Sequence, residues 1–200
     1  WGKLRSTTGN HWLWDSIRGA DYYLKSNATD GNNSSTTDLT GFVSNGFTLG
    51  NGTRMNTNSG TMASWNWLAN GAGSANTDGS ISSTVSANTT SGFSIVQYTG
   101  NGSAGATIGH GLGSTPKMII IKRTNTTGNW LTYNASNGNT YGQYLNTGAR
   151  DLDIVYWNNT SPTDSVFSLG TVVDNNASGS TYIAYCFADV QGYSKFGSYT

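Results

Sequence analysis

Apolar residues along this chain occur in short runs, many of which alternate with polar residues and end at Gly, Asn or Asp. Alternation with a period of two is typical of β-strands, and the runs are too short for long helices. The pattern predicts strands at residues 11–14, 41–49, 61–68, 93–99, 106–109, 117–123, 129–133, 154–157, 165–169, 181–188 and 193–199.

The segments between these runs contain Asn-Gly and Asp-Gly pairs, such as those at Asn45 and Asp78. These pairs adopt the positive φ angles that tight hairpins require. The run from Met118 to Ile121 has no polar position, which predicts a central strand that is buried on both faces. Many short strands with frequent turns predict an all-β fold, with β-sandwich or jelly-roll units in tandem and little or no helix.

The chain repeats itself at a spacing of about 120 residues. Thr-Thr-Gly-Asn at residues 7–10 returns at 126–129, Phe47 matches Phe167, and residues 61–67 (TMASWNW) match 181–187 (TYIAYCF). Residues 1–3 fall on 120–122, and residues 192–200 echo the segment that starts at Gly92. We therefore interpret the chain as a window cut from a longer repetitive protein.

The repeat divides the chain into three parts. We expect a first unit at residues 1–70 that is incomplete at its N-terminus, a linker at 71–91 and a second unit at 92–200, in which 192–200 resemble the opening strand of a further unit. The linker assignment depends on the small polar residues of 71–91, although Ile81 and Val85 can attach that segment to a neighbouring surface. Apolar positions persist between the copies whereas polar ones do not, which indicates that a fold was duplicated.

Composition narrows the function classes. Gly, Ser, Thr and Asn make up about half of the residues, there is no Glu, and the formal net charge is zero. The chain therefore lacks the basic surface typical of nucleic-acid binding, and no apolar run is long enough for membrane insertion. The single cysteine, Cys186, cannot form an intramolecular disulfide, and we interpret it as a small buried residue.

Several motifs resemble chemical sites, but a structural role explains each one better. Residues 100–105 fit the GxGxxG pattern, yet a strand and not a helix is predicted to follow them. Asp151 and Asp153 can share a strand face, as an acid–base pair or a hard-cation site would require, but a solvated strand edge is the preferred interpretation. His110 lies between glycines and is interpreted as a turn-stabilising imidazole. We predict no catalytic residue, cofactor or metal.

The aromatic residues suggest a different site. Trp65 and Trp67 align with Tyr185 and Phe187, so they are predicted to be core or interface residues, with a sugar-stacking platform as the alternative. Trp157, which is bordered by polar turn residues, is predicted to be exposed. Together with Tyr141, Trp157 is the candidate for stacking on a glycan.

The segments at residues 92–134, 165–170, 181–200 and 76–96 resemble the tandem repeat domains of virion proteins from tailed bacteriophages, especially marine and cyanobacterial ones. Residues 11–30 and 46–50 resemble a variant unit of the same proteins, whereas 138–164 depart from the pattern, as a variable recognition loop would. The resemblance implies a tail-fibre-like structural role and offers no established catalytic residues to carry over.

These observations lead to three hypotheses. The first is a non-enzymatic virion structural and attachment module that is extracellular, assembles as a homo-oligomer and contacts other copies, neighbouring virion proteins and a host-surface glycan. The second is a lectin-like carbohydrate-binding module that uses Trp157 or Tyr141. The third is a polysaccharide-degrading enzyme that uses Asp151 and Asp153.

Overall fold

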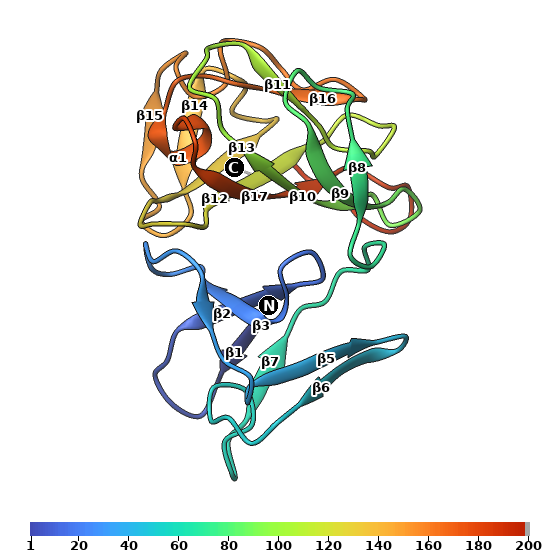
Figure 1. The fold of residues 1–200 in the computed structure, drawn as a ribbon, viewed down its shortest axis with the longest axis vertical. Helices are drawn as coiled ribbons and strands as arrows, with labels where there is room; N and C mark the ends of the chain where they lie inside the picture. Colours follow the sequence, from blue (N-terminus) through green and yellow to red (C-terminus); the bar gives the residue numbers. More distant parts are fainter. Residues whose placement is uncertain (199–200) are drawn as a thin grey trace.

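Two large antiparallel sheets organise the computed structural model, which describes residues 1–198 (Figure 1). The first sheet has the strand order β4-β3-β2-β1-β7. Its strands are β1 (Gly2–Leu4), β2 (His11–Asp15), β3 (Gly19–Lys25), β4 (Asn33–Ser34) and β7 (Met62–Ser64).

The second sheet has eight strands in the order β15-β14-β13-β12-β17-β10-β9-β8. Its strands are β8 (Ser74–Asn76), β9 (Ser83–Asn88), β10 (Phe93–Thr99), β12 (Met118–Arg123), β13 (Trp130–Asn134), β14 (Tyr141–Tyr144), β15 (Arg150–Leu152) and β17 (Thr181–Phe187). The predicted central strand is confirmed, because β12 lies between β13 and β17.

A small two-stranded sheet covers the outer face of each large one. The hairpin of β5 (Leu39–Val43) and β6 (Gly46–Leu49) covers the first sheet, and β11 (Ala106–Gly109) with β16 (Val166–Leu169) covers the second. The described residues contain one helix, α1 (Val173–Asn176), which is a single turn. The predicted all-β sandwich fold with little helix is therefore confirmed.

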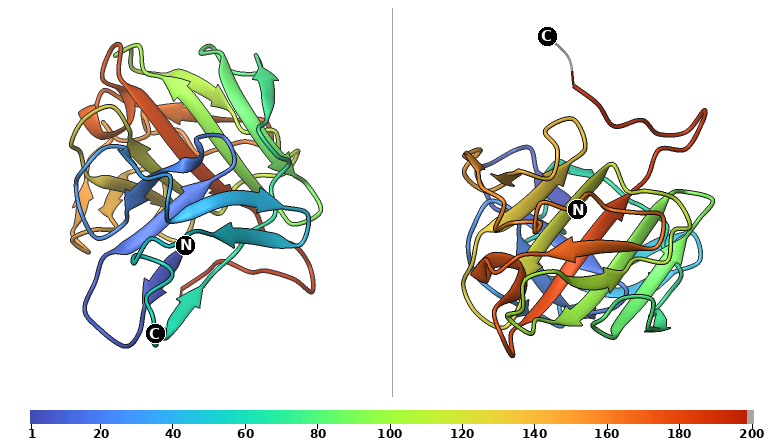
Figure 2. Two further views of the ribbon diagram at one scale, coloured as in Figure 1. Left: turned by 60° about the horizontal axis from the view of Figure 1, so that its bottom comes forward. Right: turned by 90° about the horizontal axis from the view of Figure 1, so that it is seen from above.

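The two sandwiches stack through their large sheets, so the molecule has four layers (Figures 1 and 2). Strand β17 shows how the sequence allows this stacking. Tyr182, Ala184 and Cys186 face the core under β11 and β16, whereas Ile183, Tyr185 and Phe187 face the first sheet. Because every side chain in this run is apolar or aromatic, both faces of the strand can be buried.

The two large sheets share their strand order and register over three strands. Gly2 pairs with Ser64 and with Trp12 in the first sheet, and the aligned residue Ile121 pairs with Ala184 and Leu131 in the second. Sequence alignment places Ser64 on Ala184 and Trp12 on Leu131. Strands β2-β1-β7 thus occupy the same relative positions as β13-β12-β17.

Four predictions need correction. The predicted strand at residues 41–49 is a hairpin, because the Ser44-Asn45 turn separates β5 from β6. The expected linker at residues 71–91 supplies β8 and β9, and Val85 lies in the core, because a Thr/Ser-rich segment can hydrogen-bond along the edge of β10 without apolar alternation. Residues 154–157 form turns instead of a strand. Residues 193–198 form no strand and make only an isolated bridge between Val190 and Ser194, while Tyr199 and Thr200 lie outside the described residues.

We refer to residues 1–70 as the first unit and residues 71–198 as the second unit. Hydrogen bonds join the units along one side. The indole N–H of Trp130 donates to the carbonyls of Lys25 (2.9 Å) and Ala28 (3.1 Å), and the Lys122 ammonium donates to the Thr29 carbonyl (3.1 Å). Within the described residues no helix has the length and hydropathy needed to cross a bilayer.

Candidate functional site

A cavity of about 730 Å³ lies between the two units, at the end of the first sheet where β1 begins. Its lining is largely aromatic, and the rings come from both units. The first unit contributes Trp1, Trp65 and Trp67, and the second contributes Phe93, Phe187 and Tyr193. We call this cavity the aromatic cleft.

Strand pairing positions the tryptophans of the cleft. Trp1 and Trp65 are opposite each other, with each backbone N–H donating to the other residue's carbonyl at 2.9 Å. The Trp67 ring packs against Phe93 and Phe187, with centroid distances of 6.1 and 5.7 Å. Even so, Trp65 is 52% exposed and Trp67 is 39% exposed, so the cleft presents aromatic surface to solvent.

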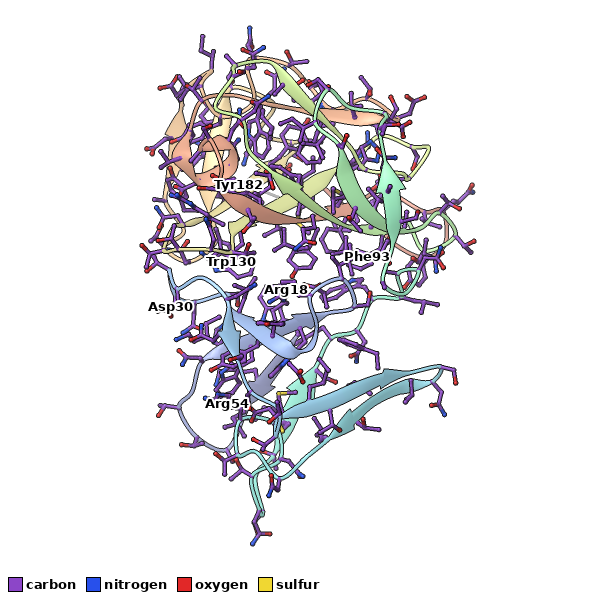
Figure 3. The ribbon with its side chains drawn as sticks, viewed as in Figure 1. Arg18, Asp30, Arg54, Phe93, Trp130 and Tyr182 are labelled. Atoms are coloured by element: carbon purple, nitrogen blue, oxygen red, sulfur yellow. The ribbon has the colours of Figure 1, made fainter. Side chains whose placement is uncertain are left out.

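A buried ion pair lies beside the cleft, between the two units, where Figure 3 labels Arg18. Arg18 Nε contacts Asp15 Oδ2 at 2.6 Å, and both side chains are almost completely buried. The Tyr185 hydroxyl of the second unit donates to the same carboxylate oxygen at 2.7 Å. Burial, reinforced by the Asp15 charge, raises the pKa of Tyr185 well above its usual value, so the hydroxyl keeps its proton as a donor.

The geometry of this cluster indicates a clamp between the units. Asp15 Oδ1 accepts the backbone N–H groups of Ile17 and Arg18, and Arg18 also donates to the Leu13 carbonyl at 3.1 Å and to Asn32 Oδ1 at 3.2 Å. Both carboxylate oxygens of Asp15 therefore have partners inside the protein. A buried pair that is satisfied in this way holds its surroundings in one arrangement.

Two buried polar atoms that border the cleft have no partner among the described residues. They are Trp14 Nε1 and Ser26 Oγ, and both residues line the cavity. Buried donors and acceptors in folded proteins nearly always have a partner, which includes water or a ligand. Both atoms are shielded from solvent, so the cleft presents its aromatic rings, and not these two atoms, to a ligand.

The predicted glycan-stacking residues do not form a platform. Trp157 is 1% exposed, its indole N–H donates to the Tyr141 carbonyl at 2.9 Å, and its ring packs edge-on against Tyr133. The prediction of an exposed Trp157 was wrong, because Asn158 and Asn159 adopt positive φ angles of 51° and 48° in the turn that folds the indole into the core.

Tyr141 has a partner of its own. The Arg150 guanidinium lies over its ring at 4.7 Å from the centroid, which covers one ring face. With Trp157 buried, Tyr141 has no second ring beside it that could extend a sugar-binding surface. The structure therefore does not bring the two predicted residues together as an exposed pair.

Asp151 and Asp153 have separate roles at the exposed edge of the second sheet. Asp151 lies in β15 and accepts a hydrogen bond from the Tyr156 hydroxyl at 3.1 Å, whereas Asp153 follows the strand and caps the backbone N–H of Val155 at 3.0 Å. Within residues 1–198 no three acidic, histidine or cysteine side chains converge in a way that could hold a metal ion.

The remaining motif residues are structural. His110 is buried, accepts the Leu112 N–H at 3.3 Å, and has a pKa lowered by burial, which agrees with a turn-stabilising imidazole. Cys186 is buried as predicted, and burial raises the pKa of its thiol to about 12. Residues 100–105 lead into strand β11, as predicted, and Asn101 and Gly102 donate to the Asn176 side chain.

The sequence prediction did not find the aromatic cleft. Trp65 and Trp67 were predicted to be core or interface residues because their counterparts are aromatic, and the counterparts Tyr185 and Phe187 are indeed buried. The alignment of the two copies carried no signal for the exposure of these tryptophans, because their exposure depends on which strands lie beside β7.

Comparisons with known proteins give one match. A family model described as a domain of unknown function (DUF7483) matches residues 1–200. No curated protein and no solved structure matches the chain.

Proposed function

The chain belongs to the DUF7483 family, and we propose that it is a non-enzymatic structural and attachment module of a virion appendage, located outside the cell. The observation that carries this proposal is the fusion of the two units into one stack. The faces that meet contain Leu13 and Leu24 of the first unit and Ile120, Ile183 and Tyr185 of the second.

A rigid junction is useful to an appendage, because a hinge between units would dissipate force and blur the position of an attachment surface. The Asp15–Arg18–Tyr185 clamp, the Trp130 and Lys122 hydrogen bonds and the apolar contact all act across the same junction. The uncharged Thr, Ser and Asn surface and the resemblance to phage repeat domains support the same interpretation.

Labelling of intact particles tests this proposal. Fab fragments raised against the purified chain should decorate an appendage or the capsid surface in electron micrographs of the phage that encodes it. Fab fragments pre-absorbed with the purified chain are the control. The proposal is wrong if the protein is present in infected cells but purified particles neither contain it nor bind the Fab.

A second candidate function is carbohydrate binding, and the aromatic cleft favours it. Sugars stack on exposed aromatic rings, and the cleft offers the rings of Trp65 and Trp67. In this proposal the ligand is a host-surface glycan, and the binding site is the cleft instead of the Trp157 region.

A glycan array followed by titration tests this candidate. Trp65→Ala should weaken binding by about tenfold or more, which corresponds to the loss of one stacking contact. Trp157→Phe is the matched control, because Trp157 is buried away from the cleft and its variant should bind like the wild type. Equal effects of the two substitutions, or no binding on the array, would exclude the cleft as a glycan site.

A further inference from the structure

Asn-Gly pairs are a sequence feature that the proposed function does not use. They occur at Asn45, Asn51, Asn70, Asn101 and Asn137. In such a pair the backbone nitrogen of the glycine can attack the side-chain amide carbon of the asparagine, because glycine has no Cβ to hinder the approach. A new carbon–nitrogen bond closes a succinimide ring, and the side-chain nitrogen leaves as ammonia. Water then opens the ring to aspartate or isoaspartate, so the reaction consumes only water.

Backbone hydrogen bonds protect four of these five pairs. The attacking nitrogen must first lose its proton, and an N–H that donates a hydrogen bond exchanges its proton only after local opening. Three of the protected glycines donate to oxygen atoms of other residues: Gly52 to the Thr37 carbonyl (2.7 Å), Gly138 to the Asn134 carbonyl (3.1 Å) and Gly102 to Asn176 Oδ1 (3.3 Å). The fourth, Gly46, pairs with Val43 at the end of the β5–β6 hairpin.

Gly71 differs from the other four glycines. No described residue accepts its N–H or forms a hydrogen bond with the side chain of Asn70, and both residues are exposed. Gly71 has a φ of 64°, and no atom lies within 4 Å of the position that a Cβ would take. The side-chain amide of Asn70 is therefore free to rotate onto the Gly71 nitrogen.

The Asn70-Gly71 pair lies between β7 and β8, where the chain passes from the first unit to the second (Figure 1). The Gly71 carbonyl accepts the hydroxyl of Ser16 from the first unit at 2.5 Å and the hydroxyl of Ser86 from the second unit at 2.8 Å. The Asn70 N–H donates to the same Ser86 oxygen at 2.8 Å. These bonds fix the spacing between the Asn70 nitrogen and the Gly71 carbonyl and join it to both units.

We propose that Asn70 deamidates spontaneously in the folded protein and that the isoaspartyl product loosens the junction between the units. In isoaspartate the main chain runs through the side-chain carboxyl carbon, which adds one carbon atom between the nitrogen of residue 70 and Gly71. The longer path moves the Gly71 carbonyl away from the Ser16 and Ser86 hydroxyls that it accepts. The inference rests on the junction that carries the proposed function, but it is tested on the purified chain.

Mass spectrometry of the aged chain tests the site. The purified protein is incubated at mildly alkaline pH in heavy-oxygen water, which marks each ring that opens during the incubation, and is then digested. Asn70 should convert at least about tenfold faster than each of the other four asparagines, because only those four require local opening. In urea, where the chain is unfolded, the five rates should converge to within about threefold.

Hydrogen exchange tests the effect on the junction. The Ile17 and Arg18 amides donate to Asp15 Oδ1 in the turn that contains Ser16. Both amides should exchange at least about threefold faster in aged wild type than in fresh wild type, because this turn loses its bond to Gly71.

Two substitutions serve as controls for the exchange measurement. Asn70→Gln keeps a neutral amide but must close a larger ring, so its aged and fresh samples should exchange alike. Ser16→Ala removes the bond to the Gly71 carbonyl without deamidation, so it should raise both exchange rates in fresh protein.

Two outcomes overturn the inference. Equal conversion of Asn70 and the other four asparagines in the folded chain would exclude a selective site. Conversion of Asn70 with unchanged exchange at Ile17 and Arg18 would exclude the effect on the junction. Neither result changes the labelling of intact particles by Fab fragments, so a failure here is distinguishable from failure of the proposed function.

Discussion

The two units place similar side chains on equivalent strands, yet they bury them to different extents. Tyr185 and Phe187 of β17 are each 6% exposed, whereas their counterparts Trp65 and Trp67 are 52% and 39% exposed. The difference arises from the neighbours, because β17 has a strand on both sides and β7 has one. An aromatic residue on a strand can be buried, but it becomes buried only when an adjacent strand covers it.

The units differ in charge as well. The first unit contains two ion pairs with a buried carboxylate, Asp15–Arg18 and Asp38–Arg54, each at 2.6 Å. Asn134 and Asn137 align with Asp15 and Arg18 in the second unit. The first unit, with smaller sheets, thus adds two ion pairs to its apolar core, and the Asp15–Arg18 pair has no charged counterpart at the aligned positions of the second unit.

Removal of the buried Arg18 guanidinium should have the largest effect. Arg18→Met leaves the Asp15 carboxylate buried without its counter-ion and should lower the free energy of unfolding by about 3–5 kcal/mol. Urea denaturation measures the change. The double variant Asp15→Asn with Arg18→Met should recover part of the loss, and a loss below about 1 kcal/mol in the single variant would contradict the clamp.

Substitution at one aligned pair of positions should show that β17 is buried and the end of β7 is exposed. Cys186 is completely buried in β17, and its counterpart Asn66 follows β7 in an exposed position. Cys186→Asn buries an amide without partners and should cost about 2–4 kcal/mol, while Asn66→Cys should change stability by less than about 0.5 kcal/mol. Thermal unfolding of both variants checks the asymmetry, and equal effects would contradict it.

Lys122 links the units and should make stability depend on pH. Its ammonium donates to the Thr29 and Arg123 carbonyls, and burial lowers its pKa to about 8 from an ordinary value of 10.5. Between these two values the unfolded chain binds more protons at this site than the folded chain, so this site's contribution to stability rises with pH. Relative to Lys122→Met, the wild type should gain about 2 kcal/mol from pH 8 to pH 10.

The measurement for Lys122 is the difference between the two proteins in urea denaturation at each pH. Burial raises the pKa values of tyrosines such as Tyr98 and Tyr185, so their contribution to the free energy of unfolding falls at high pH. This fall is the same in both proteins and cancels in the difference. A difference that does not change with pH would show that Lys122 keeps an ordinary pKa in the folded protein.

A smaller effect is expected at Trp65 than at its counterpart Tyr185. Trp65→Ala should lower the free energy of unfolding by about 1–2 kcal/mol, because half of the side chain is already in water. Tyr185→Ala at the equivalent position should cost about 3–5 kcal/mol. Similar losses for the two variants would show that Trp65 belongs to the core of the first unit.

Sequence patterns predicted the buried strands in which apolar residues alternate with polar ones or form a continuous run. Strands β10, β12, β13 and β17 follow this rule, and both faces of β17 are apolar. The patterns failed for residues 71–91, where a polar segment became β8 and β9 by pairing with β10, and for residues 154–157, where an apolar run became a turn. Edge strands are polar because one side and often one face remain in water, so their sequences resemble loops.

The candidate site was predictable only in part. The aromatic residues at positions 65 and 67 were predicted to be core or interface residues, but their exposure depends on which strands lie beside β7. The prediction that Trp157 is exposed was wrong because the polar residues that follow it form a turn, and the indole lies inside the core. Local polarity describes the turn and not the direction of the side chain it carries.

The sequence by itself determined the all-β class, the strands with apolar periodicity and the internal repeat, because these properties follow from local backbone preference and from which side chains avoid water. Only the tertiary structure decided that the two large sheets stack face to face and that Asp15, Arg18 and Tyr185 meet across the junction. Those features depend on contacts between residues far apart in the chain, and no local pattern encodes the partner of a strand edge.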